Sequence, residues 1–390
     1  MDMRERYGRQ INGHSYGTFV DVIRREIMPS VGAAALNAVA FACSKAVEEL
    51  GESPHGIQVF TSANVIQNTK DMFIPGQHQE KGMAMAAVLG AYAGSTNDRL
   101  EILGKVSDSE VEFARTLVNQ GIFKVQVVED YGSSWIRARV FTDDHYASVD
   151  VDGCYDNVVR VEVDGNLLVD RKDRQDQGSL LLKDITLEDI LDFADQVEIS
   201  DVEYPLLYLA ETNQKIARAG KEYHYGNCEG HNYQPSSQSD VANLLKQPVL
   251  FAAEAFADGC ALPVVLVAGS ANIGITVSLA LDAYIQAVHK SHEDLIRALC
   301  IGVLEAVRLE YINRHRRPVP CGTTYAAAAV GAAVAYVEGK SRGDALWVAN
   351  EISNHVETEH CSGASLACVH RITDAIDTTL STFGRLSKDI

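Results

Sequence analysis

The sequence is poor in proline and in basic residues, and it has no long uninterrupted apolar run. Only 9 of its 390 residues are Pro, and without a low-complexity tract the composition is that of a globular protein. Lys and Arg total 34 against 53 Asp and Glu, a formal charge of −19, which argues against a nucleic-acid partner because such a protein needs a basic face. The longest stretches of low charge, 256–287 and 319–337, are interrupted by Gly, Asn, Thr and Ser. A membrane span needs about 20 predominantly apolar residues, so we expect no membrane partner.

The start of the chain also lacks the features of a leader segment. Residues 1–10 include three Arg and a Glu, with no apolar stretch behind them. The 8 cysteines are scattered along the chain, which favours reduced thiols over a disulfide framework. We therefore expect a cytoplasmic protein whose core forms without disulfides.

Three zones of the chain differ in the spacing of their apolar residues. Up to about residue 118 the spacing predicts helices over 22–28, 33–50, 82–93 and 109–120, with a strand over 57–62. Between 121 and 200 apolar and polar residues alternate in 123–129, 135–142, 146–152 and 158–163, and turn residues separate these runs. We interpret this second zone as an antiparallel meander followed by a helix over 187–194.

The third zone, from residue 204 onward, is again helical in spacing and becomes rich in Ala. Because the first and third zones are alike in composition, we expect one helical domain (1–120 and 203–390) that a β-rich segment (121–202) interrupts. The predicted fold class is α+β: a mainly helical domain with an antiparallel, β-rich α/β insert.

Small residues fill the loop 268–274, which precedes a predicted helix. Without bulky side chains, backbone N–H groups can face a ligand at a helix N-terminus, where the helix dipole favours a carboxylate. Ser270 and Asn272 are the candidate binding residues in this loop. A tight turn packed against a neighbouring helix would have the same composition, and the spacing alone leaves both interpretations open.

Two further loops carry thiols at the start of predicted helices. Their candidate residues are Cys321 and Thr323 in the first loop, and His360, Cys361, Ser362 and Ser365 in the second. The helix dipole favours a thiolate at a helix start, which suits metal binding or nucleophilic chemistry. Neither loop has Cys-x-x-Cys spacing, so thiols without a ligand are the alternative.

Two histidines are candidates for acid–base work. His78 lies in the polar segment 75–82, near Glu80 and Lys81, before a helix of small residues. A solvated surface histidine is the alternative there. His360 adjoins Cys361 and could deprotonate that thiol, although neighbours in sequence often point apart.

In this order, the loops resemble segments of the L-cysteine desulfidase family, which shares its catalytic domain with the iron–sulfur L-serine dehydratases. The resemblance runs from about residue 22 to residue 382. It rests on 27–32 (IMPSVG), 61–68 (TSANVIQN), 74–76 (IPG), 269–274 (GSANIG), 321–324 (CGTT) and 361–368 (CSGASLAC). It implies a serine dehydratase alpha-chain-like fold for the helical domain, and substrate-binding roles for Asn64 and Asn68.

In that family three cysteines hold a 4Fe–4S cluster that acts on the leaving group of the substrate. Cys321 and Cys361 match two of the ligand positions, whereas the third is Ala33, which has no ligand atom. Ser362 and Gln67 replace an Asp and a Lys of the family. Because two thiolates do not supply the usual ligands of a four-iron cluster, we expect no cofactor. An altered 4Fe–4S cluster, or zinc on Cys321, Cys361 and a histidine, is the alternative.

The predicted function is a lyase or an isomerase/cyclase that transfers protons on a small carboxylate-bearing metabolite, which would suit specialised metabolism. The candidates for acid–base or nucleophilic roles are Cys321, Cys361, His78 and His360. The alternatives are a retained L-cysteine desulfidase or L-serine dehydratase, and a ligand-binding pseudoenzyme without activity. We also expect a homodimer.

Overall fold

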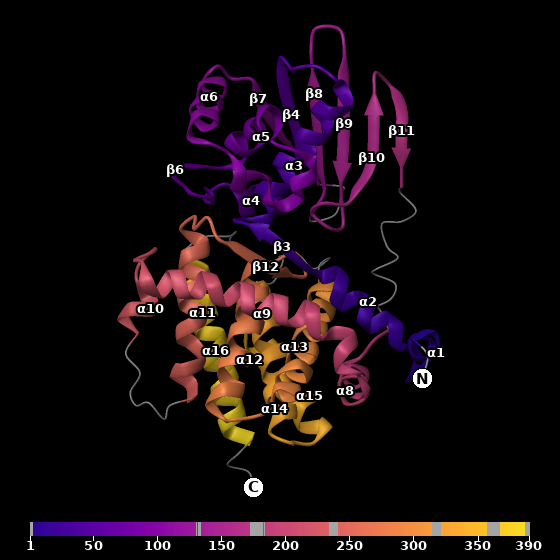
Figure 1. The fold of residues 1–390 in the computed structure, drawn as a ribbon, viewed down its shortest axis with the longest axis vertical. Coiled ribbons are helices and arrows are strands. Elements are labelled where there is room, and N and C mark those ends of the chain that lie inside the picture. Colours follow the sequence, from indigo (N-terminus) through magenta and orange to yellow (C-terminus); the bar gives the residue numbers. More distant parts are fainter. Residues whose placement is uncertain are drawn as a thin grey trace.

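The computed structural model describes residues 3–129, 131, 134–171, 182, 184–233, 241–313, 321–356 and 367–386. It has two parts, one above the other in Figure 1, with a pair of strands between them. The upper part carries a six-stranded sheet and its helices, and the lower part is a bundle of longer helices. The predicted α+β class is confirmed, with helices predominating. None of the described helices is long and apolar enough to cross a lipid bilayer.

The sheet of the upper part has the strand order β11-β10-β9-β8-β4-β7. The strands are β4 (Gly56–Thr61), β7 (Phe123–Val127), β8 (Ile136–Phe141), β9 (Tyr146–Val151), β10 (Val158–Val163) and β11 (Asn166–Asp170). From β8 to β11 each strand pairs antiparallel with the next. This confirms the meander that the alternation predicts for β8, β9 and β10, whereas β11 is not among the predicted strands. β4 confirms the strand predicted over 57–62 and lies between β8 and β7.

The alternation also places 123–129 in the antiparallel meander, and this prediction is wrong. β7 pairs with β4, and the two strands run parallel, with Val125 beside Val59. A period-two pattern identifies a half-buried strand but not the direction of its partner. Because β4 comes from the first zone, the sheet unites residues from both sides of position 120. The division into a helical domain and an insert stays a prediction.

Helices and a hairpin complete the upper part. They are α3 (Ala34–Leu50), α4 (Ala63–Thr69), the hairpin of β5 (Phe73–Ile74) and β6 (Gln77–Lys81), α5 (Met83–Tyr92), the 3₁₀ segment η1 (Thr96–Lys105) and α6 (Asp108–Asn119). α3 and α5 touch closely: a Cβ on Gly90 would lie 2.2 Å from the carbonyl oxygen of Ala40. A glycine is therefore required at this crossing, as the small residues of 82–93 predict.

The two strands between the parts are β3 (Ile27–Val31) and β12 (Pro263–Val267), which pair antiparallel. The sequence analysis predicts neither strand, because a short apolar run cannot be told from a buried helical segment by its spacing. On the other side of β12, the Asn213 side chain bonds both backbone groups of Val265. Its oxygen accepts from Val265 N at 2.9 Å and its nitrogen donates to Val265 O at 3.2 Å. The Asn213 side chain thus makes the two hydrogen bonds to Val265 that a third strand could make.

The lower part holds the remaining helices around a centre of small residues. They are α1 (Met3–Gly8), the strands β1 (Gln10–Ile11) and β2 (His14–Ser15), α2 (Tyr16–Glu26), α8 (Leu187–Gln196), α9 (Ile199–Glu222), α10 (Glu229–Asn232), α11 (Val241–Ala257), α12 (Ala271–Ala287), α13 (His292–Asn313), α14 (Gly322–Val337), α15 (Arg342–Val356) and α16 (Ala367–Leu386). α12 packs directly on β12, since a Cβ on Gly274 would lie 2.1 Å from Val265 O. The strand pair therefore positions the start of α12.

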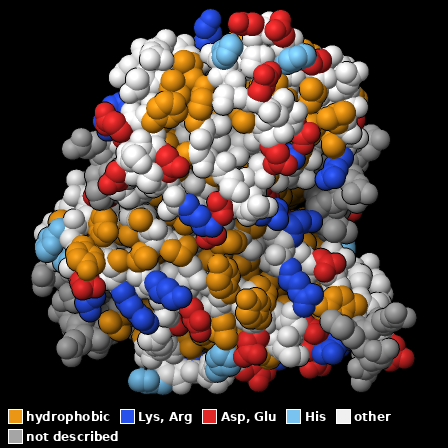
Figure 2. Space-filling model, turned by 45° about the horizontal axis from the view of Figure 1, so that its top comes forward, with side chains coloured by type: hydrophobic (Ala, Val, Ile, Leu, Met, Phe, Trp, Pro, Cys, Tyr) orange, Lys and Arg blue, Asp and Glu red, His pale blue; other side chains and the backbone are white. Residues whose placement is uncertain are grey.

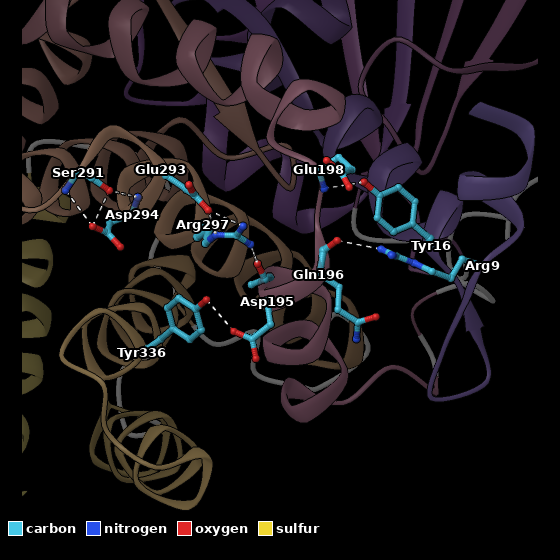
Figure 3. Close-up of polar contacts among 11 residues, drawn as sticks. Arg9, Tyr16, Asp195, Gln196, Glu198, Ser291, Glu293, Asp294, Arg297 and Tyr336 are labelled. Atoms are coloured by element: carbon cyan, nitrogen blue, oxygen red, sulfur yellow. Dashed lines mark hydrogen bonds and ion pairs between the residues drawn. The ribbon is translucent and has the colours of Figure 1, made fainter. Parts of the chain in front are cut away.

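Arginines from elsewhere in the chain hold the carboxyl end of α8 (Figure 3). Arg297 of α13 donates to the carbonyl oxygen of Ala194, and Arg9 donates to that of Gln196 at 2.8 Å. The last carbonyl groups of a helix have no partner within the helix and carry partial negative charge, so cationic donors satisfy them. α8, whose apolar stripe predicts a helix over 187–194, thus connects the N-terminal residues to the bundle.

Candidate functional site

A tight turn connects β12 to α12. Val267 and Ser270 exchange two backbone hydrogen bonds across it, at 3.2 and 3.0 Å. Between them, Ala268 and Gly269 have φ angles of 51° and 72°, which is the pattern of a type I′ turn. An alanine in the left-handed region costs roughly 1–2 kcal/mol, and such strain is concentrated at functional sites. The tight turn, one of the two interpretations that the sequence leaves open, is present here at the start of α12. The binding of a ligand by this loop stays a prediction.

A second helix start carries a thiol: Cys321 is the N-cap residue of α14. Cys321 is buried, with 4% of its surface exposed, and the hydroxyl of Thr323 donates to its sulfur at 3.1 Å. A hydroxyl donor and the positive end of a helix dipole both stabilise negative charge on sulfur. The local structure therefore places a hydroxyl donor and the start of a helix beside the sulfur of Cys321.

The starts of α12 and α14 lie side by side. A Cβ on Gly322 would lie 3.2 Å from Cδ1 of Ile273 and 3.8 Å from the hydroxyl oxygen of Ser270. Ser270 is the N-cap of α12, where its hydroxyl accepts from Ile273 N at 3.3 Å. The first N–H groups of each helix have no partner within that helix. Two sets of such donors, each at a positive dipole end, form a place suited to an anionic group.

A buried hydroxyl near this place lacks a partner. The Oγ1 atom of Thr324, in the first turn of α14, is buried and makes no hydrogen bond within the described part of the chain. Oγ1 of Thr276 in α12 is also buried and also makes no hydrogen bond among the described residues. An unsatisfied buried hydroxyl costs about 1–3 kcal/mol, and a ligand is one explanation for keeping it. The sequence analysis includes Thr324 only within the segment 321–324 and does not identify Thr276, which nothing distinguishes from a core threonine.

The structure brings together four of the candidate residues. Ser270 and Asn272 belong to the start of α12, and Cys321 and Thr323 to the start of α14. The tip of the upper part adjoins them, because a Cβ on Gly269 would lie 3.5 Å from the ring of Tyr155. Tyr155 follows β9 and has no sequence signal that would select it.

Asn64 and Asn68 lie one turn apart on α4, in the upper part, and both are half-buried. Their predicted role in substrate binding stays a prediction. The polar loop that the sequence predicts around His78 is wrong for its backbone, which belongs to strand β6. The turn residues Pro75 and Gly76 close a hairpin there, so the polar residues after them pair with β5. His360, Cys361, Ser362 and Ser365 lie outside the described residues.

The start of α3 is buried among apolar residues. Ala33, its N-cap, is 4% exposed, and Gly32 before it has φ of 71°. Asn37 in the first turns donates to Val31 O at 2.7 Å and accepts from Leu103 N at 3.1 Å. These hydrogen bonds attach α3 to β3 and η1. Ala33 therefore has a structural place in the core of the upper part.

A shallow surface pocket lies between α3, η1 and β10. Its charged lining residues are Lys45, Arg99 and Asp156. Lys45 pairs with two glutamates of its own helix, and Arg99 pairs with Asp156 at 2.6 Å. Because these charges already neutralise one another, the pocket offers less to an anionic ligand than the paired helix starts.

Cys43 and Cys300 lie in the interior of α3 and α13 and not at a helix start. Burial raises the pKa of Cys43 to about 12, and burial also raises the pKa of the Cys300 thiol. A thiol that stays protonated is a poor nucleophile and a poor base. Among the described residues no three His, Cys, Asp or Glu side chains are arranged to hold a metal ion. Since Cys361 is outside them, a site without a cofactor stays a prediction.

Relatives of the chain align over almost its whole length. It is 29% identical over 367 residues to a UPF0597 protein of Lachnoclostridium phytofermentans, covering 94% of this chain and 88% of that protein. It is 28% identical over 380 residues to a UPF0597 protein of Desulfitobacterium hafniense, covering 97% and 86%. A UPF0597 protein of Vibrio campbellii is 26% identical over 379 residues, covering 94% and 88%. No family model matches the chain.

These comparisons overturn the resemblance to the L-cysteine desulfidase and iron–sulfur L-serine dehydratase family. Relatives that match the chain nearly end to end are named UPF0597 proteins, a name that states no activity. The segments that carried the resemblance are short and rich in Gly, Ser and Ala. Tight turns before helices favour those residues in many folds, so their shared order was a weak signal. Ala33 is accordingly not the remnant of a cluster ligand.

Proposed function

We propose that the protein is an enzyme, a lyase or an isomerase, that transfers a proton on a small metabolite bearing a carboxylate. The ligand binds at the adjacent starts of α12 and α14. One observation carries the proposal: Thr323 donates to the sulfur of Cys321 at the first turn of α14, beside the N-cap Ser270 of α12. This arrangement combines an anion site with a thiol that can act as a base.

Carboxylate binding follows from the adjacent helix starts. Gly322 lies beside Ser270 and Ile273, and each helix contributes partial positive charge at its start. Ile273 N and Thr324 N already bond to Ser270 and Cys321, so the ligand would take the other N–H groups of the first turns. The hydroxyl of Thr324 is a further donor that lacks a partner among the described residues. A carboxylate oxygen accepts well from donors of this kind. Ser270 and Asn272 orient the group from the side of α12.

Proton transfer follows from the position of Cys321. With the carboxylate held by the helix starts, the carbon next to it can lie near the sulfur. The thiolate takes the proton from that carbon, and the electron pair left behind is stabilised by the donors around the carboxylate. The pair then expels a leaving group from the neighbouring carbon, which is an elimination, or it takes a proton back, which is an isomerisation.

The experiment measures proton exchange, because this readout does not require the product to be known. The protein is incubated in D₂O with a panel of small amino, hydroxy and dicarboxylic acids, and deuterium next to the carboxylate is measured by mass spectrometry. We expect incorporation into at least one acid by the wild type, and loss of incorporation in Cys321→Ser. Cys43→Ser, which changes a buried thiol in the interior of α3, is the matched control.

Measuring exchange and binding together distinguishes catalysis from simple binding. Exchange that persists in Cys321→Ser would remove Cys321 from its role as base. Binding of an acid without any exchange would contradict the enzyme and support a ligand-binding protein. We further propose that the substrate is a free small molecule in the cytoplasm. The panel tests whether that molecule is a small acid.

A further inference from the structure

The outer edge of β7 is uncovered. β7 ends the six-stranded sheet, and every side chain from Lys124 to Val127 is exposed. Val125 and Val127 are each 46% exposed, and Phe113 of the adjacent α6 is 52% exposed. Figure 2 shows apolar side chains gathered on the upper part, on the side where α6 and β7 lie in Figure 1. An uncovered apolar edge strand is a template for pairing with another strand.

The direction of the backbone groups along β7 follows from its pairing with β4. Ile57 N donates to Ile122 O and Val128 N donates to Thr61 O, both at 2.9 Å. In a parallel pair the bonding residues of one strand alternate, so the even-numbered residues of β7 bond to β4. Phe123, Val125 and Val127 therefore direct their N–H and C=O groups outward.

These three outward residues are symmetric about Val125. If a second β7 lies antiparallel with its Val125 opposite this one, Phe123 of each copy lies opposite Val127 of the other. Each of these pairs is of the kind that exchanges two hydrogen bonds. A two-fold axis through the centre of the strand thus satisfies all of its outward backbone groups, as the closed symmetry of most homodimers requires.

The side chains fit the same register. The apolar row of Phe123, Val125 and Val127 faces its own copy on one side of the joined sheet. On the other side Lys124 lies opposite Gln126, so no like charges are directly opposed. A second copy of this chain therefore places an apolar strand beside β7 and brings no two like charges opposite each other.

The other edge of the sheet differs. β11 also exposes apolar residues, with Leu167 at 47% and Leu168 at 57%. Its pairing with β10, however, shifts register between Val161 and Glu162. A bulge twists an edge strand and interrupts its row of hydrogen-bonding groups, which protects it from pairing. The regular edge is the β7 edge.

We propose that β7 pairs antiparallel with β7 of a second copy about a two-fold axis at Val125, which joins the two six-stranded sheets into one. Because the strand pair alone is smaller than the standard interface of about 800 Å² per partner, the dimer depends on protein concentration. This inference is independent of the chemistry at Cys321.

The first test is the mass of the full chain in solution across a wide concentration range, by sedimentation. We expect the wild type to move from 42.5 kDa toward twice that mass as its concentration rises. Val125→Lys places two like charges opposite each other at the axis, and it should remain a monomer throughout. Leu168→Lys makes the same change on the exposed β11 edge and should behave as the wild type.

A second variant reports the register. Cys replacing Val125 in each copy would lie at a Cα separation of about 5.5 Å, within the range that a disulfide bridges. We expect mild oxidation to link Val125→Cys into a covalent dimer and to leave Leu168→Cys unlinked. A wild type that stays at the monomer mass, or a Val125→Lys that dimerises as well as Leu168→Lys, would overturn the proposal.

Discussion

The hydroxyl of Thr323 donates a hydrogen bond to the sulfur of Cys321, 3.1 Å away. Both side chains are buried at the first turn of α14, and the start of α12 lies against the same turn. In this position the hydroxyl and the dipole of α14 act together on one sulfur atom. The candidate chemistry can therefore be tested by substituting Thr323 and its neighbour Thr324.

Removing the Thr323 hydroxyl should slow the reaction of the thiol. Thr323→Val keeps the shape but loses the donor, and a hydrogen bond of about 1 kcal/mol corresponds to roughly a fivefold slower alkylation by iodoacetamide. The rate is measured on the Cys321 peptide by mass spectrometry. Thr324→Val, the same change at the next residue, should leave the rate nearly as it is. Equal slowing in both variants would show that the hydroxyl of Thr323 has no specific effect on the sulfur.

Thr324→Val should instead change stability. Its hydroxyl is buried without a partner among the described residues, so an isosteric methyl group removes a desolvation cost. We expect the free energy of unfolding in urea to rise by about 1 kcal/mol. A protein keeps such a cost where function requires it, and the same variant should lose deuterium exchange. A fall in stability would mean that the hydroxyl has a partner in solution.

Two arginines that contact α8, one from α13 and one from α15, should differ in their contribution to stability. Arg297 reaches the carbonyl oxygen of Ala194 and its side chain is 17% exposed, whereas that of Arg342 is 41% exposed and pairs with surface carboxylates. Arg297→Ala leaves a helix end unsatisfied and should cost about 1–3 kcal/mol. Arg342→Ala should cost at most about 1 kcal/mol. Equal losses in urea unfolding would contradict this assignment.

Asp189 should make stability depend on pH. Burial disfavours its charge, but hydrogen bonds from Thr186 and Asn12 outweigh burial and lower its pKa below the ordinary value of 3.8. A lowered pKa in the folded state contributes stability above the ordinary value, and this contribution is lost as pH falls below it. Asp189→Asn should therefore be less stable than the wild type at pH 7. The two unfolding free energies should converge in acid, and a constant difference down to low pH would rule out this linkage.

Elements that depend on neighbours in sequence could be predicted. The meander of β8, β9 and β10 follows from alternation and from turns between adjacent strands. α8 follows from its apolar stripe, and the helix starts before α12 and α14 follow from small residues and a cysteine at the boundary. The candidate residues Ser270 and Cys321 could be selected on that basis. Their contact could not, because it depends on how two helices pack.

The sequence by itself determined the α+β class, most helices and the loops that bear the candidate chemistry, since caps, turns and periodicity act over a few residues. Only the tertiary structure decided the parallel direction of β7, the strand pair of β3 and β12, and the meeting of Ser270 with Gly322. Hydrogen bonds between strands and contacts between helices join residues far apart in the chain, and many partners satisfy the same local pattern. Which partner is chosen depends on the packing of the whole core.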